Sequence, residues 1–320
     1  MAARRFSSPF SLALALALAA CARERPETPW NEARLRSLTT AQKAAQLVTA
    51  RAAPAPGDTA LADSAVARLA ALARSGLGGV WRAGGSAAAA RMLVDTLQAS
   101  AALPLLVAAE LGRGAGGAFA GATELPAAAR VGGDDAEGVA RALAGTAARE
   151  ARTLGIHLGM VRAPALAPAG GELPLELRNP RAAAALAAFL EGLRGAGVLA
   201  GVAALEPAAS GDTALPVPRW DRASLEATQL TPLRRAMHEG VDAISLGTLA
   251  LPALTDDSLP LPLSPQAVLG LVRRDLAHDG LVVADLDPGG LLARRYGETG
   301  AAVAAVAAGA DLLLGAADPA

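Results

Sequence analysis

The chain has 320 residues, and its 29 lysines and arginines against 30 aspartates and glutamates give a formal net charge of −1. This balance leaves no basic surface for a phosphate backbone, so we expect no nucleic-acid partner. The mean hydropathy of +0.34 comes from alanine and leucine. After the first residues, no apolar run reaches the roughly 18 residues of a spanning helix, since Asp311 interrupts the longest candidate, residues 300–317.

Residues 1–21 have the pattern of an export signal. Arg4 and Arg5 precede an apolar stretch, and Leu18-Ala19-Ala20 lead into Cys21. The segment resembles a bacterial lipoprotein signal, which implies lipid attachment at Cys21; the alternative is an ordinary signal peptide that contains a cysteine. Lipid chains would hold the protein on a membrane without a spanning helix. Within that family of signals, Ala22 rather than aspartate favours the outer membrane if the host is Gram-negative.

Cys21 is also the single cysteine of the chain, so an intramolecular disulfide is excluded in any compartment. Residues 22–34 contain prolines and several charges and are predicted to form a tether. The rest of the chain, residues 35–320, is long enough for one large domain or two small ones.

Short apolar runs alternate with alanine-rich stretches of helical length through this region. The runs are mostly continuous, as in parallel strands that are buried on both faces. The predicted strands are Gln46–Ala50, Gly78–Trp81, Leu105–Ala109, Ile156–Val161, Val198–Ala204, Asp242–Leu246, Leu281–Ala284 and Asp311–Leu314. The predicted helices include Ala136–Leu154, Arg181–Arg194, Leu225–Glu239 and Pro265–Leu276.

Eight strands that alternate with helices indicate an α/β domain of the (β/α)8 TIM-type barrel class. A doubly wound sheet is the alternative, but no GxGxxG motif follows a first strand. The glycine-rich piece GRGAGGAFAG, residues 112–121, is interpreted as a loop because no helix start follows it.

Asp285 is the residue with the clearest chemical meaning. It ends the apolar run Leu281–Ala284, and a carboxylate at the carboxyl end of a barrel strand is how such folds present a nucleophile. The alternative is a solvated loop aspartate, and Asp287 is a competitor two residues later.

The order of the segments resembles the N-terminal barrel of glycoside hydrolase family 3, of the β-N-acetylhexosaminidase and β-glucosidase type. The similarity runs from about Leu35 to Pro319. The segments that carry it are LRSLTTAQKAAQLV (35–48), GLGGVWRAGG (76–85), ATELPAAARVGGDDAEGVARALAGTAAREARTLGI (122–156), AGVLAGVAALEPAASGDT (196–213), EGVDAISLGTLALPAL (239–254), LSPQAVLGLVRRDLAHDGLVVADL (263–286) and GAAVAAVAAGADLLLGAADP (300–319).

The resemblance implies retaining hydrolysis of β-linked sugars, in which one carboxylate attacks the anomeric carbon and an acid protonates the leaving oxygen. The nucleophile position of the family falls on Asp285. The family's Lys-His-Phe-Pro-Gly-His-Gly-Asp-Thr motif matches AALEPAASGDT, residues 203–213, where Ala203 and Ala204 stand for the basic pair and Asp212 is retained. Methyl groups cannot donate hydrogen bonds to sugar hydroxyls.

Other family features are also missing, which indicates a degenerate active site. The loop that carries the family's general acid/base is absent after Thr213. Glu110 stands for the aspartate of the family's Asp-Gln-Glu-Gly-Gly motif after the second strand, residues 163–167 lack a carboxylate, and Gly247-Thr248 stands for Ala-His. Glu110 and Asp212 are predicted substrate-binding residues, and either of them or Glu206 could serve as a replacement acid.

Two functions are therefore predicted. The first is hydrolysis of O-glycosyl bonds in β-linked hexosides or N-acetylhexosides by a lipid-anchored protein of the cell envelope. The second is binding of a glycan or a protein by a catalytically inactive relative, and a purely structural lipoprotein is a third option. The expected partner is a β-linked glycan or a peptidoglycan fragment, and no cofactor and no metal are expected. His157, His238 and His278 match no acid/base position of the family. Family barrels continue past GADLLL with a helix, so the barrel is predicted to be incomplete at its C-terminus.

Overall fold

The computed structural model describes residues 29–127, 130–163, 180–207, 214–286 and 290–315. The chain divides into two compact units, Met1–Lys43 and Ala44–Ala320. The predicted signal, Cys21 and most of the predicted tether lie outside the described residues. Helix α2 (Trp30–Ser37) belongs to the first unit and begins within the segment predicted to be the tether, while α3 (Thr40–Gln46) crosses the boundary.

The opening segment that resembles the family, residues 35–48, contains the end of α2 and the whole of α3. Thr39 begins a separate helix, because its hydroxyl accepts the backbone N–H of Gln42 at 3.3 Å and the Gln42 side chain accepts the backbone N–H of Thr39 at 2.9 Å. This reciprocal arrangement satisfies two N–H groups at a helix start and separates α2 from α3. The chain then leaves α3 after Gln46 and enters the first strand.

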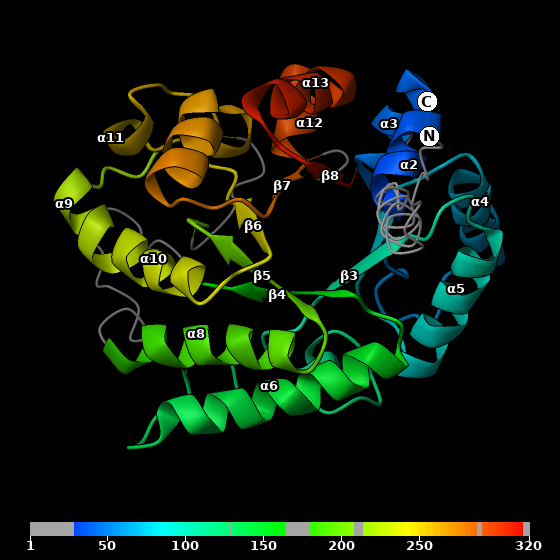
Figure 1. Ribbon diagram of the computed structural model, residues 1–320, viewed down its shortest axis with the longest axis horizontal. Coiled ribbons are helices and arrows are strands. Elements are labelled where there is room, and N and C mark those ends of the chain that lie inside the picture. The colour runs from blue at the N-terminus through cyan, green and yellow to red at the C-terminus, as the bar shows by residue number, and fades with distance from the viewer. Residues whose placement is uncertain (1–28, 128–129, 164–179, 208–213, 287–289, 316–320) are drawn as a thin grey trace, which may run out of the picture. The chain divides into compact units, whose positions relative to one another are not determined.

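The second unit contains a closed barrel of eight parallel strands in sequence order, which confirms the predicted (β/α)8 class (Figure 1). All eight predicted strands are present, with shifts of up to two residues at their ends. Their bounds are β1 (Val48–Ala52), β2 (Gly79–Arg82), β3 (Leu106–Glu110), β4 (Leu158–Arg162), β5 (Leu199–Ala204), β6 (Ala243–Leu246), β7 (Leu281–Asp285) and β8 (Leu312–Leu314). The predicted C-terminal incompleteness concerns residues after Gly315, which lie outside the described part.

Helices surround this ring (Figure 1). Their bounds are α4 (Asp63–Arg74), α5 (Ala87–Ser100), α6 (Ala136–Thr153), α8 (Pro180–Gly195), α9 (Arg222–Leu225), α10 (Thr231–His238), α11 (Pro252–Thr255), α12 (Leu291–Tyr296) and α13 (Glu298–Ala308), with short 3₁₀ turns at Ala115–Gly117 and Leu261–Leu263. The helices predicted over 225–239 and 265–276 are present, but Glu226–Leu230 and Gln266–Asp275 within them are π-helical, whereas α10 is an α-helix.

Side chains on alternate strand positions fill the barrel interior. The interior cluster contains Ala108, Leu158, Met160, Ala203, Ala243, Val283 and Leu314. The intervening positions of the strands pack outward against the helices, as Val107 and Val202 do. Because successive side chains of a strand point to opposite faces, this pattern fixes which residue of each strand projects at the carboxyl end of the barrel.

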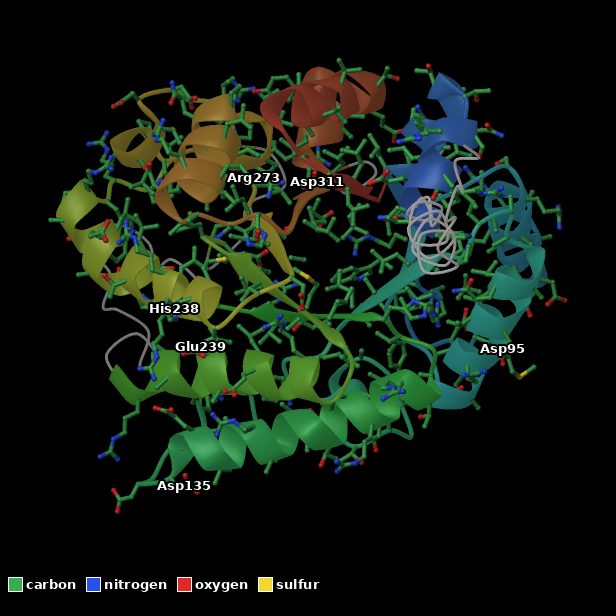
Figure 2. All side chains as sticks on the ribbon, viewed as in Figure 1. Asp95, Asp135, His238, Glu239, Arg273 and Asp311 are labelled. Carbon is green, nitrogen blue, oxygen red and sulfur yellow. The ribbon has the colours of Figure 1, made fainter. Side chains whose placement is uncertain are left out.

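The ring closes where β1 meets β8. Val48 lies opposite Leu313 and Thr49 opposite Leu314, so two residue pairs form this seam, whereas β4 and β5 share five. At the amino-terminal end of the barrel, an ion pair lies beside the first residues of β7 and β8. Arg273, on the π-helix, contacts Asp311, whose carboxylate also accepts the backbone N–H of Val282 at 2.7 Å (Figure 2). Among the described residues, no helix is long and apolar enough to cross a bilayer.

Candidate active site

Charged side chains gather at the carboxyl-terminal rim of the barrel, which we call the mouth. Glu110, Arg162 and Asp285 each follow an interior residue of the same strand by two positions, so they continue the inward-facing row beyond the hydrophobic layer. Arg51 bears the same relation to Thr49 on β1, whose neighbours Val48 and Ala50 pack outward. Catalytic groups of barrel enzymes occupy this end.

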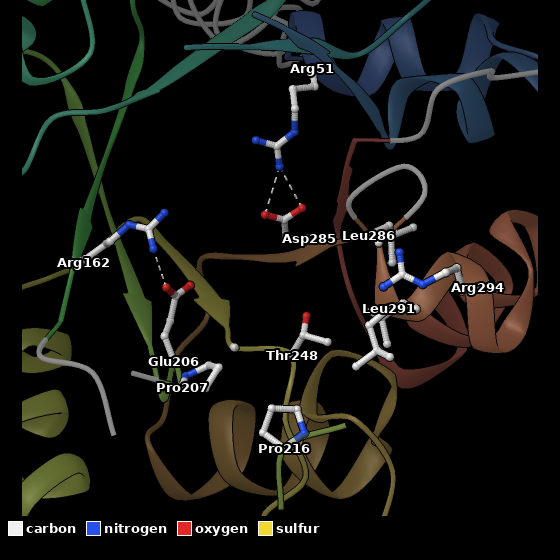
Figure 3. A pocket seen from close by; sticks show the side chains of 13 residues that line it. Arg51, Arg162, Glu206, Pro207, Pro216, Thr248, Asp285, Leu286, Leu291 and Arg294 are labelled. Carbon is white, nitrogen blue, oxygen red and sulfur yellow. Dashed lines mark hydrogen bonds and ion pairs between the residues drawn. The ribbon is translucent and has the colours of Figure 1, made fainter. Parts of the chain in front are cut away.

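A cavity of about 340 Å³ opens at the mouth (Figure 3). This volume falls in the range of small-molecule sites, roughly 300–1,000 Å³. Two carboxylates and three guanidinium groups face it. The lining residues are Arg51, Arg162, Glu206, Pro207, Pro216, Gly247, Thr248, Asp285, Leu286, Gly290, Leu291, Leu292 and Arg294.

Asp285 lies at the carboxyl end of β7 and lines the cavity, as the sequence predicts. One Nη of Arg51 donates to both of its carboxylate oxygens, at 3.1 and 3.2 Å (Figure 3). The Asp285 side chain is 39% exposed, so a ligand in the cavity can reach it. A carboxylate that a ligand can reach is the group that nucleophilic catalysis of this kind requires.

Glu206 lies across the cavity from Asp285 and belongs to a second charged group. Arg162 donates to Glu206 at 2.9 Å (Figure 3), and its Nε lies 3.4 Å from Glu110. Glu110 also accepts the backbone N–H of Gly112 at 3.1 Å. Within the described part of the chain, the two carboxylates therefore share one guanidinium.

The pKa values of both carboxyl groups, Glu206 and Glu110, are raised from their ordinary value. Burial raises the pKa of the Glu206 carboxyl; Arg162 lowers it in part, and the negative charge of Asp285 raises it again. Burial also raises the pKa of Glu110, against the lowering effect of the Gly112 N–H and of Arg162. Carboxyl groups with perturbed pKa values cluster at functional sites.

Backbone geometry fixes the direction of Glu206. Strict alternation from Ala203 would aim the side chain two positions later, at Leu205, into the mouth, but Leu205 is buried in the outer core instead. Leu205 has a φ of 54°, in the left-handed region that a leucine rarely adopts. The inverted residue brings the next side chain, Glu206, to the cavity. Strain of this kind concentrates at functional sites.

Gly247 secures that backbone from the neighbouring strand. A Cβ at this position would lie 2.6 Å from the Cα of Glu206 and closer still to the carbonyl oxygen of Leu205. A residue larger than glycine would therefore displace the Leu205–Glu206 peptide. In the sequence, Gly247-Thr248 stands for a lost Ala-His pair of the family. In the structure, glycine at position 247 is required for packing against the Leu205–Glu206 backbone.

The other predicted residues are placed as follows. Glu110 reaches the site through Arg162 and does not itself line the cavity. Ala203 faces the barrel interior and Ala204 the outer layer. Asp212 and Asp287 lie outside the described residues. In the described part of the chain no cluster of histidine, cysteine, aspartate and glutamate could hold a metal ion.

Sequence reasoning missed Arg51 and Arg162. The predicted first strand ended at Ala50, one residue before Arg51, because Gln46 and Leu47 were included in it. Gln46 instead ends α3, and its amide donates to the carbonyl of Gly76 at 2.7 Å. An arginine directly after an apolar strand was the available signal in both cases.

Comparison with known proteins agrees with this architecture. Residues 39–320 match the family described as glycosyl hydrolase family 3 N terminal domain. A glycoside hydrolase family 3 β-N-acetylglucosaminidase from Paenibacillus sp. str. FPU-7 is 28% identical with a TM-score of 0.70, over 87% of this chain and 55% of that one. This chain thus spans about half the length of that relative. Comparison with curated proteins gave no match.

Two further structures resemble the fold at lower identity. NagZ from Neisseria gonorrhoeae is 23% identical with a TM-score of 0.66, over 84% of this chain and 80% of that one. A β-N-acetylhexosaminidase from Beutenbergia cavernae DSM 12333 is 23% identical with a TM-score of 0.68, over 88% of each chain. The family match covers most of the described barrel, its mouth included. The chain therefore belongs to glycoside hydrolase family 3.

Proposed function

We propose that this protein hydrolyses O-glycosyl bonds of β-linked hexosides or N-acetylhexosides with retention of configuration, with Asp285 as the nucleophile. One observation carries the proposal: Asp285 stands at the carboxyl end of a barrel strand, beside Arg51, in a cavity that also contains a second carboxyl group. Two carboxyl groups at one sugar site are the requirement of this reaction class.

The mouth has the features that the first step needs. The Asp285 carboxylate would attack the anomeric carbon and form a glycosyl ester, which water then opens. Arg51 keeps the attacking oxygens in one orientation by its two hydrogen bonds to them. The arginines and Thr248 provide donors for sugar hydroxyls around the cavity.

The sugar class is proposed from the relative that is most informative about it. The Paenibacillus protein is described as a β-N-acetylglucosaminidase, and it shares 28% of its aligned residues with this chain. We therefore propose β-linked glycans with N-acetylhexosamine units, peptidoglycan fragments included, as substrates.

Binding without turnover is the second candidate function. It is supported by Ala203 and Ala204, which stand where the family carries a basic pair for sugar hydroxyls. Ala203 is buried in the hydrophobic interior and Ala204 in the outer layer, so neither contributes a polar group to the mouth. Such a protein would bind a glycan, or a protein partner, at the same cavity.

We also propose that the protein is exported and lipid-anchored through Cys21, in the outer membrane if the host is Gram-negative. The support is the segment Leu18-Ala19-Ala20-Cys21 after a basic start and an apolar stretch. Labelling of cells with a radioactive fatty acid should mark the wild-type protein, whereas Cys21→Ala should remain unlabelled and leave the membrane fraction. Labelling of the variant would refute the anchor.

Enzymatic turnover is tested with activated β-glycosides. A dinitrophenyl leaving group needs little acid assistance, so wild type should release it with a burst that equals the enzyme concentration when ester hydrolysis is slow. Asp285→Ala should lose on the order of 10³-fold or more of kcat/KM, because the proposed nucleophile is removed. Mass spectrometry with a 2-deoxy-2-fluoro glycoside should locate the sugar on Asp285. If wild type and Asp285→Ala are indistinguishable with glucosides and N-acetylglucosaminides, hydrolysis is refuted; glycan binding without turnover would then support the second candidate.

A further inference from the structure

We infer that Glu206 is the general acid/base of this site, and so replaces the acid/base loop that the sequence lacks. This inference rests on the proposed hydrolysis with Asp285 as nucleophile. Glu206 and Asp285 are the two carboxylates that line the described cavity, and they approach it from β5 and β7 (Figure 3). A reacting bond in the cavity would therefore lie between them.

The surroundings of Glu206 allow it to hold a proton at neutral pH. Its side chain is only 25% exposed, and Arg162 is divided between it and Glu110. With both carboxylates ionised, the three side chains carry one uncompensated negative charge in a partly buried place, and a proton on one carboxyl removes that charge. Burial and the nearby Asp285 raise the pKa of Glu206 in the same direction.

The charged groups that face Glu206 come from several elements. Arg162 is on β4 and Glu110 on β3; across the cavity lie Asp285 on β7, Arg51 on β1 and Arg294 on α12. Formation of the ester neutralises Asp285, and this removes the negative charge that raises the pKa of Glu206. The pKa of Glu206 therefore falls after the first step, and this allows the group to be ionised when it acts as the base in the second step.

The position of Glu206 is rigid, which a proton donor needs. Leu205 holds its left-handed conformation in a buried setting, 1% exposed, and Gly247 packs directly against the Cα of Glu206. Groups that must stay within hydrogen-bond reach of a leaving oxygen depend on such backbone support.

The chemistry balances over two steps. In the first, the Asp285 carboxylate forms a bond to the anomeric carbon, the glycosidic C–O bond breaks, and the Glu206 carboxylic acid gives its proton to the leaving oxygen. In the second, the Glu206 carboxylate takes a proton from water, whose oxygen bonds to the anomeric carbon. The ester bond to Asp285 breaks, and both groups return to their starting protonation states.

Glu206→Ala and Glu206→Gln test the inference through their dependence on the leaving group. With an alkyl or methylumbelliferyl β-glycoside, kcat/KM should fall roughly 10²–10⁴-fold, because proton donation contributes about that much. With the dinitrophenyl glycoside, kcat/KM should stay within about threefold of wild type, because the leaving group needs no proton. Sodium azide should raise kcat of Glu206→Ala and yield the β-glycosyl azide.

Two matched variants separate this role from general damage. Glu110→Gln leaves Arg162 to Glu206 alone and so lowers the pKa of Glu206; kcat/KM should fall more with the methylumbelliferyl glycoside than with the dinitrophenyl glycoside, and less than in Glu206→Gln. Asp95→Asn, in an exposed ion pair with Arg91 on the outer helix α5, should change neither (Figure 2).

The outcomes distinguish the inference from the proposed function. Absence of turnover and of a trapped ester in wild type would overturn both. If wild type is active but Glu206→Ala loses the same factor with both leaving groups and does not respond to azide, only the acid/base assignment is overturned. Selective loss with azide rescue supports it.

Discussion

Two sides of the barrel mouth hold carboxylates in opposite ways. On the β7 and β1 side, Asp285 accepts two hydrogen bonds from Arg51. On the β3 to β5 side, Glu110 and Glu206 divide the single guanidinium of Arg162, and burial raises the pKa of both. One side therefore pairs a carboxylate with one guanidinium, whereas the other raises the pKa of two carboxyl groups that share one guanidinium.

In the proposed mechanism, two carboxyl groups take different roles, one as the nucleophile and one as the acid/base. Their chemical types are nearly the same, so their roles depend on how much positive charge the barrel places beside each. The charge comes from other strands of the barrel, β1 for Asp285 and β4 for Glu206; Arg51 precedes Asp285 by 234 positions in the chain and Arg162 precedes Glu206 by 44. Strand order, more than local sequence, thus assigns the roles.

The largest effect is expected when the Glu206 side chain is displaced from the cavity. Gly247→Ala introduces a Cβ that overlaps the Leu205–Glu206 backbone, so it should cost about 1–3 kcal/mol of stability. A displacement near 1 Å should lower kcat/KM by about 10²-fold. Urea unfolding and steady-state kinetics measure the two effects.

Gly195→Ala is the control for that substitution. Gly195 ends α8 and has no atom near the position of an added Cβ, so the change should leave kcat/KM unaltered. It should keep or slightly raise stability, by up to about 1 kcal/mol. Equal kinetic losses in the two variants would contradict the packing role of Gly247.

A second substitution removes the Arg162 guanidinium, which Glu110 and Glu206 share. Arg162 lowers the pKa of both Glu110 and Glu206, so Arg162→Gln raises both values. The acid then stays protonated to higher pH, and the basic limb of the kcat/KM profile should move upward. Arg51→Gln is the matched change on the other side and should affect the acidic limb. A shift of the acidic limb in Arg162→Gln would contradict the assignment.

The smallest expected effect concerns stability. The folded pKa of Glu110 is raised above its unfolded value of about 4.5, so the folded state binds the proton more tightly. This contribution to stability is complete below pH 4.5 and is lost as pH rises through the folded pKa. Glu110→Gln should remove that decline, as measured by urea unfolding between pH 4 and 8 at steps of about half a unit.

Glu124→Gln, in an exposed ion pair with Arg113, is the stability control. Exposed pairs contribute about 0–1 kcal/mol, so its stability should follow the wild-type pH profile closely. If Glu110→Gln keeps the wild-type slope, burial at the mouth does not weaken the acidity of Glu110.

The barrel could be predicted from sequence because its strands are continuous apolar runs. Each predicted strand matches an observed one, and Asp285 falls where an apolar run delivers it. The predicted first strand began two residues early, at Gln46, although Gln46 ends α3 and β1 begins at Val48. The predicted strand therefore ended at Ala50, and Arg51 was not recognised as a residue of the strand.

The second half of the site could not be predicted for a different reason. The sequence places Glu206 after a strand, but its direction depends on the left-handed conformation of Leu205, which leucine disfavours. Its chemistry depends on Arg162 and Glu110, which are brought together only by the pairing of β3, β4 and β5. Both are properties of tertiary structure.

The seam between β1 and β8 has a consequence for biosynthesis. Arg51 and Asp285 lie on the two strands that flank β8, so the contact between them forms only after the ring has closed around that strand. A nascent chain on the ribosome would expose Arg51 long before Asp285 is translated. The contact between Arg51 and Asp285 at the mouth therefore forms only after β7 has been synthesised.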